Sequence, residues 1–431
     1  MISVGLLLVA SGIIFVSLAS FPTVSGRVRI LFNSRPRYRF VIAGLILFAH
    51  FAVGINFFVV APLFPLIIDD FGVSRASVSL LIALALLVHS FFGLPGGILA
   101  ARFGLKRMYF LSWFMIGLSV LSVVAPNFET LLLLRVAYGI GFGAIVPTTG
   151  PLLMQWFRPK EITIMNGLDI AALSLGVALS VSLAAPIANV VGWQASLSVF
   201  GGIAMLGAVA WGILGKVEAS TPVTGGGISL QDIFSVLRNR TILLLVGADA
   251  LVFMQYTALT SWLPTFYNEV RGMSLTQAGF ITGLLPFVGV FAVLVGGFLP
   301  LKFAAKKPFF IFPGLLLGLG GWGSFLIDST FGIYVSIILL GVGSWSYAPT
   351  LLSLPMEIPG MTPEKVAVVW GTFVTVSGIG MFLSPIVVGA MRDQTGGFTT
   401  GFIIFAVGAW ALLIVGLILP KISTNSDPAG R

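Results

Sequence analysis

The stretch GIGFGAIVPT at residues 139–148 returns as GVGSWSYAPT at residues 341–350, so the pattern G-x-G-x5-P-T occurs twice, 202 positions apart. Both copies lie inside long apolar runs. Further matches recur at nearly the same interval, where Gly167 and Gly176 are spaced like Gly371 and Gly380, 204 positions later. Similarity of this extent within one chain indicates a duplicated architecture. We therefore expect two related halves that contain the same set of helices.

The composition predicts that these helices lie in a lipid bilayer. Of the 431 residues, 58% are hydrophobic and 9% are charged, which is more apolar surface than a water-soluble core could hide. A helix needs roughly 20 apolar residues to cross the hydrocarbon layer. Twelve runs meet this requirement, and they predict an all-α membrane protein with spans near 41–66, 78–100, 108–125, 130–155, 164–190, 195–215, 241–266, 276–300, 309–327, 331–354, 366–390 and 399–420.

The runs and the segments between them predict the division of the chain. Residues 1–38 form a hydrophobic segment and a basic loop. Its first 20 residues are long enough for an extra N-terminal helix, and a wrongly chosen start codon is the alternative. Residues 217–240 read as a linker whose second part is either a helix on the membrane surface or a short soluble cap. The remaining units are two six-helix bundles, at 39–216 and 241–421, and a tail at 422–431.

The charges predict the orientation in the membrane. The net charge is +9, yet the Lys and Arg residues stand in short clusters between apolar runs, so they indicate lipid headgroups and topology and exclude nucleic acid as the partner. The opposite loops hold only Arg75, Arg271 and Arg392. By the positive-inside rule, both ends of the twelve-helix core face the cytoplasm of a multi-pass protein in the cell membrane. The chain has no cysteine, so disulfides and thiolate chemistry are excluded.

The turn between spans two and three resembles the inner-gate motif of the major facilitator superfamily. That motif combines glycines with a basic turn, and here it consists of Gly97, Arg102, Gly104, Lys106 and Arg107. The family usually has an aspartate where this chain has Ala101, which removes one charge. The resemblance covers residues 39–421. It implies that the two halves are parallel repeats that rock against each other, and that the motif holds the inner gate.

Span four carries a second part of the resemblance. Arg135 and Tyr138 precede the two glycines of the repeat in the family's Arg-x-x-polar-Gly-x-Gly pattern. An arginine within a span is costly, so it should face the bundle interior and have a partner, unless it snorkels to the headgroups. Drug exporters of the family have a Gly-Pro pair in span five, where this chain has Ser180 and Val181. The resemblance therefore favours porters of small anions over a drug or metabolite exporter.

Polar residues near the middle of spans one and seven are the first candidates for binding. His50 and Asn56 match Asp249 and Gln255, in both cases 199 positions later. His50 and Asp249 lie near the bilayer centre, where alternating access between repeats needs a site. Tyr256 shares a helix face with Asp249. In this family spans one, four, seven and ten line the central cavity, which adds Arg135, Tyr138, Ser346 and Tyr347 to the predicted substrate and coupling-ion residues.

Asp249 is the main candidate for ion coupling. A buried carboxylate favours the neutral, protonated form, which suits proton binding, and His50 could be its partner. The alternatives are a structural hydrogen bond for Asp249 and a packing role for His50. Asp169, near the basic end of span five, is instead expected to pair with Arg102 or Arg107 in the inner gate.

We expect a secondary transporter of a small organic or inorganic anion, coupled to H⁺ or Na⁺ and acting as a monomer without a cofactor. A membrane-embedded enzyme usually shows a cluster of catalytic or metal-binding residues, and no such motif occurs in this sequence. A channel is the other alternative. A parallel repeat with a site at mid-depth favours alternating access over a continuous pore.

Overall fold

A computed structural model describes residues 38–217, 238–303, 305–358, 361 and 363–419. The extra N-terminal helix and the surface helix of the linker were predicted for segments outside the described residues. Within the described residues the chain has twelve helices that are long and apolar enough to cross a membrane, as predicted. The N-terminal half contains α3 (Tyr38–Phe57), α4 (Phe64–Phe71), α5 (Arg75–Phe103), α6 (Leu105–Gly117), α7 (Phe128–Trp156), α8 (Pro159–Val191) and α9 (Trp193–Leu214). The C-terminal half contains α11 (Arg240–Glu269), α12 (Leu275–Phe298), α13 (Pro308–Leu326), α14 (Thr330–Ser346), α15 (Ala348–Glu357), α16 (Pro363–Thr395), α17 (Thr399–Ala409) and α18 (Ala411–Ile418).

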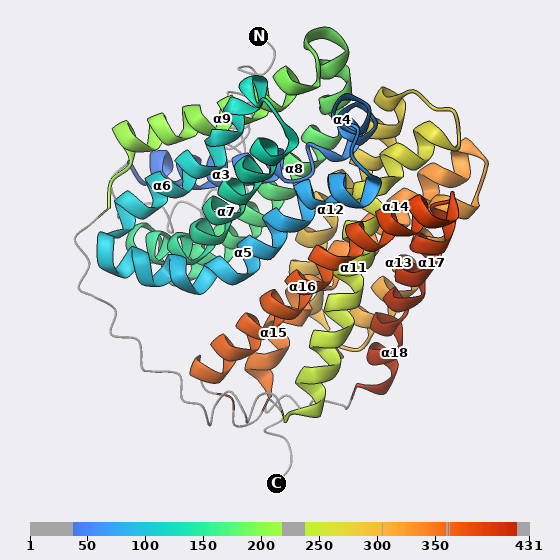
Figure 1. The fold of residues 1–431 in the computed structure, drawn as a ribbon. Coiled ribbons are helices and arrows are strands. Elements are labelled where there is room, and N and C mark those ends of the chain that lie inside the picture. The colour runs from blue at the N-terminus through green and yellow to red at the C-terminus, as the bar shows by residue number, and fades with distance from the viewer. Residues whose placement is uncertain (1–37, 218–237, 304, 359–360, 362, 420–431) are drawn as a thin grey trace, which may run out of the picture.

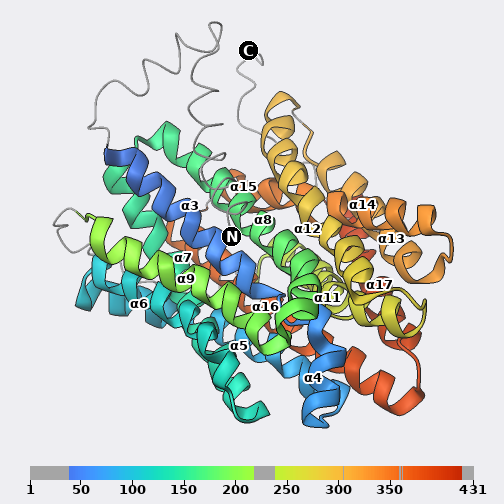
Figure 2. The same ribbon diagram turned by 90° about the horizontal axis from the view of Figure 1, so that it is seen from above.

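The helices form two bundles, one blue to green and one yellow to red (Figure 1). The bundles meet where α5 packs on α16 and where α8 packs on α12. Figure 2 shows the same division from above, with α8 and α12 side by side. We call the end with the basic turn after α5 and the start of α11 the basic end, and the opposite end, where α5 begins and α11 ends, the far end.

The repeated glycine pattern has the same packing role in both halves. A Cβ atom on Gly139 would lie 2.5 Å from the carbonyl oxygen of Ala85 on α5, and one on Gly341 would lie 2.5 Å from that of Leu285 on α12. The second glycine of each copy meets the next helix, since Gly141 faces α6 and Gly343 faces α13. Small residues let membrane helices approach this closely. The pattern therefore fixes one three-helix contact in each half, which explains why the sequence repeats it.

A methyl group at this contact is expected to destabilise the fold. In Gly341→Ala the new Cβ forces α12 and α14 apart, and overpacking of this kind costs about 1–3 kcal/mol. The measurement is the thermal unfolding midpoint of purified protein in detergent. Gly247→Ala is the matched control, because nothing lies within 4 Å of a Cβ at Gly247. Equal midpoints for both variants would contradict this account of the repeat.

Span one is broken, although the sequence analysis treated it as a single run. The helix α3 ends at Phe57, a short 3-10 turn follows at Ala61–Leu63, and α4 continues the span to Phe71. Pro62 explains the break, because proline has no N–H to donate and its ring clashes with the carbonyl one turn earlier. Span ten is also divided, between α14 and α15, with Pro349 in the first turn of α15.

Candidate functional site

Asp249 lies in a hydrogen-bonded cluster at mid-depth in the C-terminal half. Its side chain comes from α11, nine residues after the helix begins, and it is 4% exposed. The Tyr347 hydroxyl donates to Oδ1 at 2.8 Å, and the Ser377 hydroxyl donates to Oδ2 at 2.6 Å. No Lys, Arg or His of the described part of the chain forms an ion pair with this carboxylate. The sequence predicted Asp249 and Tyr347 separately as binding residues, whereas Ser377 on α16 carried no signal.

His50 and Asp169 meet in the N-terminal half. The His50 Nδ1 atom lies 3.6 Å from Asp169 Oδ1, and both side chains are buried. This corrects two expectations. The partner of His50 is Asp169 and not Asp249, because α3 packs along α8 and the His50 side chain is turned toward that helix. Asp169 in turn faces α3 and not the inner-gate arginines, because it lies ten residues into α8, beyond the basic turn.

Arg135 holds the broken end of α3. Its Nη1 atom donates to the Asn56 carbonyl at 2.6 Å and its Nη2 atom donates to the Phe57 carbonyl at 2.7 Å, while Nε donates to the Leu81 carbonyl at 2.6 Å. The carbonyls at the end of a helix lack partners within the helix and carry partial negative charge, which a guanidinium stabilises. The expected partner of Arg135 is therefore the backbone of α3 and α5. It does not snorkel, since only 5% of the residue is exposed.

Tyr138 and Asn56 also stabilise the end of α3. The Tyr138 hydroxyl donates to the Val53 carbonyl at 2.9 Å, and its ring lies under the Arg135 guanidinium, 4.5 Å from its carbon. The Asn56 amide donates to the Phe200 carbonyl on α9 at 3.1 Å. Three residues that we predicted to bind substrate thus fasten α3 to α5, α7 and α9 in this conformation. Their role in binding stays a prediction.

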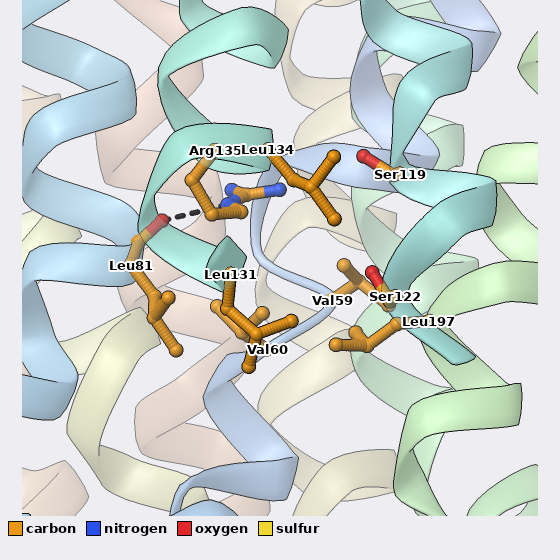
Figure 3. A pocket seen from close by; sticks show the side chains of 9 residues that line it. All are labelled: Val59, Val60, Leu81, Ser119, Ser122, Leu131, Leu134, Arg135 and Leu197. Atoms are coloured by element: carbon orange, nitrogen blue, oxygen red, sulfur yellow. Dashed lines mark hydrogen bonds between the residues drawn. The ribbon is translucent and has the colours of Figure 1, made fainter. Parts of the chain in front are cut away.

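A small pocket borders Arg135 inside the N-terminal half. Figure 3 shows its lining, with the Arg135 side chain turned toward the Leu81 carbonyl. The remaining walls come from α7, the 3-10 turn after α6, α9 and the break in span one, and they are apolar except for Ser119 and Ser122. A pocket formed within one bundle does not open when two bundles move apart. It therefore does not have the place that an alternating-access site requires.

Replacing Arg135 is expected to loosen the break in span one. A lysine keeps the charge but can reach fewer of the three carbonyls, so Arg135→Lys should lose about 2 kcal/mol of stability, given the strength of hydrogen bonds to charged groups. Thermal unfolding in detergent measures the change. Arg102→Lys is the control, because Arg102 is exposed. An unchanged midpoint for Arg135→Lys would show that the guanidinium fork is not needed to hold α3.

The other predicted binding residues lie on α11 and α14. Tyr256 packs edge-on against Trp345, with ring centroids 5.7 Å apart, and against Phe58 of span one at 6.0 Å. These rings meet across the two halves. Gln255 points away from them, since its amide lies against Gly321 on α13. Ser346 is partly buried and packs by its backbone on Gly296 of α12.

The inner-gate motif lies at the basic end as an exposed turn. Gly104 has a φ of +87°, a conformation that glycine adopts without strain, so α5 ends and α6 begins at this residue. The side chains of Arg102, Lys106 and Arg107 are exposed. Glycine's role in the turn is as expected, whereas the predicted contact with Asp169 is absent among the described residues.

A set of ion pairs at the far end joins the two halves, and the sequence analysis missed it. Arg75, which begins α5, binds Glu269 of α11 at 2.8 Å, and Glu269 also binds Arg392 of α16 at 3.2 Å. Asp393 accepts hydrogen bonds from the first two amides of α5, at 3.4 and 3.1 Å. A carboxylate at a helix N-terminus is stabilised by the helix dipole. We call Arg75, Glu269, Arg392 and Asp393 the far-end cluster.

The ion pairs at the basic end have a different arrangement. Arg39 binds Glu161 at 3.3 Å within the N-terminal half, and Lys306 binds Glu357 at 3.0 Å within the C-terminal half. Among the described residues, the ion pairs seen between the halves are those of the far-end cluster. One signal was available in the sequence: only three basic residues lie in the far-end loops, and two of them belong to this cluster.

The chain is similar in sequence and in fold to known membrane transporters. The family model for the Major Facilitator Superfamily matches residues 46–385. A probable sulfoacetate transporter, SauU of Cupriavidus necator, is 24% identical, with 93% of this chain and 98% of that protein covered. The nitrite extrusion protein of Bacillus subtilis is 25% identical over 80% of this chain and 86% of its own. The crystal structure of a bacterial homologue of the human lysosomal transporter Spinster has the same fold, with a TM-score of 0.70, 19% identity and coverage of 90% of this chain and 95% of that chain. The chain belongs to the Major Facilitator Superfamily of membrane transporters.

Proposed function

We propose that the protein moves a small organic or inorganic anion across the membrane by alternating access, coupled to a cation. The observation that carries the proposal is the asymmetry of its ion pairs. The far-end cluster ties α5 to α11 and α16, whereas Arg39–Glu161 and Lys306–Glu357 each stay within one half. Breaking the far-end contacts while forming others at the basic end would turn the site between the halves toward the opposite face.

Asp249 is the proposed site of the coupling cation. Its carboxylate lies near mid-depth with two hydroxyl donors and no cationic partner among the described residues. An ionised carboxylate buried in this way is costly, so binding of H⁺ or Na⁺ stabilises the site when the bundles close around it. Tyr347 lies at the junction of α14 and α15, and Ser377 lies on α16, so a cation at Asp249 acts on α11, on this junction in span ten and on α16.

An anion is the substrate class that the relatives and the residues favour. The two relatives carry the names of sulfoacetate and nitrite transport. In this chain His50 and Arg135 place basic side chains inside the N-terminal half, and the described part of span one has no acidic side chain before Asp69. A drug or metabolite exporter of the same superfamily is the second candidate, favoured only by the aromatic contact between Phe58, Tyr256 and Trp345.

We further propose that the basic end faces the cytoplasm, by the positive-inside rule, and that one chain is the working unit because it contains both halves.

Counterflow in proteoliposomes tests this function. Vesicles loaded with unlabelled sulfoacetate or nitrite are diluted into labelled anion without an imposed gradient, and a carrier then accumulates label transiently whereas a channel does not. A proton or sodium gradient is added in separate reactions. Counterflow of one of these anions, driven further by one of the two cations, is the expected result. A panel of lipophilic drugs tests the exporter reading, and transport of those compounds with no counterflow of either anion would replace the proposal.

A further inference from the structure

Three titratable side chains gather inside the N-terminal half, apart from the Asp249 cluster. His50 comes from α3, Asp169 from α8 and Tyr109 from α6. Their exposed fractions are 8%, 4% and 0%. The helices α3 and α8 pack along each other, as Figure 2 shows, and Tyr109 interacts electrostatically with Asp169. We call these three residues the His50–Asp169 cluster.

The cluster has unused hydrogen-bonding capacity. The His50 Nδ1 atom lies 3.2 Å from the Ile46 carbonyl, so Nδ1 carries a hydrogen and Nε2 is the nitrogen that can take another proton. Asp169 Oδ1 is buried without a hydrogen-bond partner among the described residues. The distance of 3.6 Å between His50 Nδ1 and Asp169 Oδ1 is too long for a direct hydrogen bond, and the contact is an ion pair only when the imidazole carries a second proton. A buried carboxylate oxygen without a donor is costly, and a proton on it removes that cost.

Two described neighbours of the cluster, Thr149 and Trp211, are neutral. Thr149 of α7 lies beside the Tyr109 hydroxyl, and its own hydroxyl donates to the Ile145 carbonyl at 2.9 Å. From α9, the Trp211 ring packs on Tyr109 with centroids 4.5 Å apart. The titratable groups that face one another here are therefore His50 of α3, Tyr109 of α6 and Asp169 of α8, so a change in protonation falls on these three side chains.

We propose that the His50–Asp169 cluster is a second proton-binding site, which takes up a proton when an anion binds between the halves. The inference deepens the proposed function and rests on it. With one shared proton, the pair of imidazole and carboxyl has no net charge. A second proton, taken from water on the basic side by His50 Nε2 or by the carboxylate, gives the pair one positive charge, which favours a nearby anion. By linkage the anion favours the proton equally, and both leave on the other side.

The two buried carboxylates differ in a way that assigns them different tasks. Both oxygens of Asp249 already accept hydroxyl hydrogens, whereas Asp169 has an unpartnered oxygen and an imidazole beside it. Only the His50–Asp169 cluster can therefore become positively charged by taking a proton. One cation at Asp249 and one proton at this cluster predict that two cations move with each anion.

Infrared difference spectroscopy tests the site without any transport. Purified protein in detergent is titrated with acid while the absorption of protonated carboxyl groups is recorded. We expect a component of this signal to be missing from Asp169→Asn and to change its pH midpoint in His50→Gln. Asp69→Asn is the matched control, because Asp69 is exposed at the end of α4. A complete signal in Asp169→Asn, or the same midpoint in His50→Gln, would overturn the assignment.

The ratio of protons to anions in proteoliposomes tests the linkage. Proton entry is followed with a trapped pH indicator, and sulfoacetate or nitrite entry with label. The double variant His50→Gln with Asp169→Asn removes both groups that can take this proton, so it is expected to carry one proton fewer per anion than the unchanged protein while counterflow continues. Asp69→Asn should keep the full ratio. An unchanged ratio in the double variant sinks the inference. If neither anion is transported by the unchanged protein, the proposed substrate class fails, and the infrared result still decides the site.

Discussion

Asp249→Asn is expected to abolish cation-driven accumulation of the anion while counterflow continues. Asparagine has nearly the shape of the protonated side chain, and its amide can still bond to Tyr347 and Ser377, but it can neither bind nor release a proton and holds Na⁺ more weakly than a carboxylate. The variant should then behave as a carrier whose coupling site is permanently neutral. Exchange of substrate for substrate needs no net movement of the coupling cation.

The measurement compares two assays on the same proteoliposomes. Accumulation under an imposed proton or sodium gradient is expected to fall to the level of vesicles without protein, whereas counterflow of the same anion stays measurable. Asp69→Asn, an identical chemical change at an exposed position, should retain both activities. Full accumulation by Asp249→Asn would remove Asp249 from the coupling mechanism. Loss of both activities with unchanged thermal stability would assign Asp249 to substrate binding.

The two hydroxyl groups that donate to Asp249 lead to a related prediction. Tyr347→Phe and Ser377→Ala each remove one hydroxyl donor from the carboxylate, so each should weaken coupling without eliminating it. In each variant, the steady-state accumulation of the anion should lie between that of the unchanged protein and that of Asp249→Asn. Equal accumulation in the unchanged protein and both variants would show that the hydroxyls do not tune the site.

Much of the fold could be predicted because its causes are local. Twelve apolar runs and a repeated glycine pattern depend only on composition and spacing. The described part of the chain has twelve helices long and apolar enough to cross a membrane, with Gly139 and Gly341 at equivalent contacts. The break at Phe57 was predictable in principle from Pro62. What the sequence did not show is that a guanidinium from another helix would satisfy the carbonyls at that break.

Partners across helices were harder to predict, because they depend on how each helix is rotated about its axis. Asp169 was expected to reach Arg102 or Arg107 from its distance to the basic end, yet its side chain faces α3 and His50. His50 and Asp249 occupy related positions in the two repeats, but equivalence under the repeat places them in separate bundles. Ser377 is one hydroxyl among many, so its contact with Asp249 depends on tertiary packing alone.

The far-end cluster leads to the second large prediction, for Glu269→Gln. Glu269 binds both Arg75 of the N-terminal half and Arg392 of α16, so the neutral amide weakens one contact between the halves and leaves Arg392 less well held. Exposed or partly exposed ion pairs contribute about 0.2–1 kcal/mol each. The far end is therefore expected to open more often in the variant, by a factor of roughly three to ten if about 1 kcal/mol is lost.

The absence of cysteine in the chain makes this opening measurable. A single Ser384→Cys places a thiol on α16 at a position that is 0% exposed and next to Pro385, whose carbonyl accepts a hydrogen bond from Ser79 of α5 at 2.9 Å. Labelling by a membrane-impermeant maleimide should be faster when Glu269→Gln is added. Asp328→Asn is the matched control, because Asp328 pairs with Arg271 at the same end but within the C-terminal half. That pair does not resist separation of the halves, so Asp328→Asn should leave the labelling rate unchanged. Equal rates in the Glu269→Gln and Asp328→Asn backgrounds would mean that the far-end ion pairs do not hold the halves together, and the proposal of alternating access would lose its energetic basis.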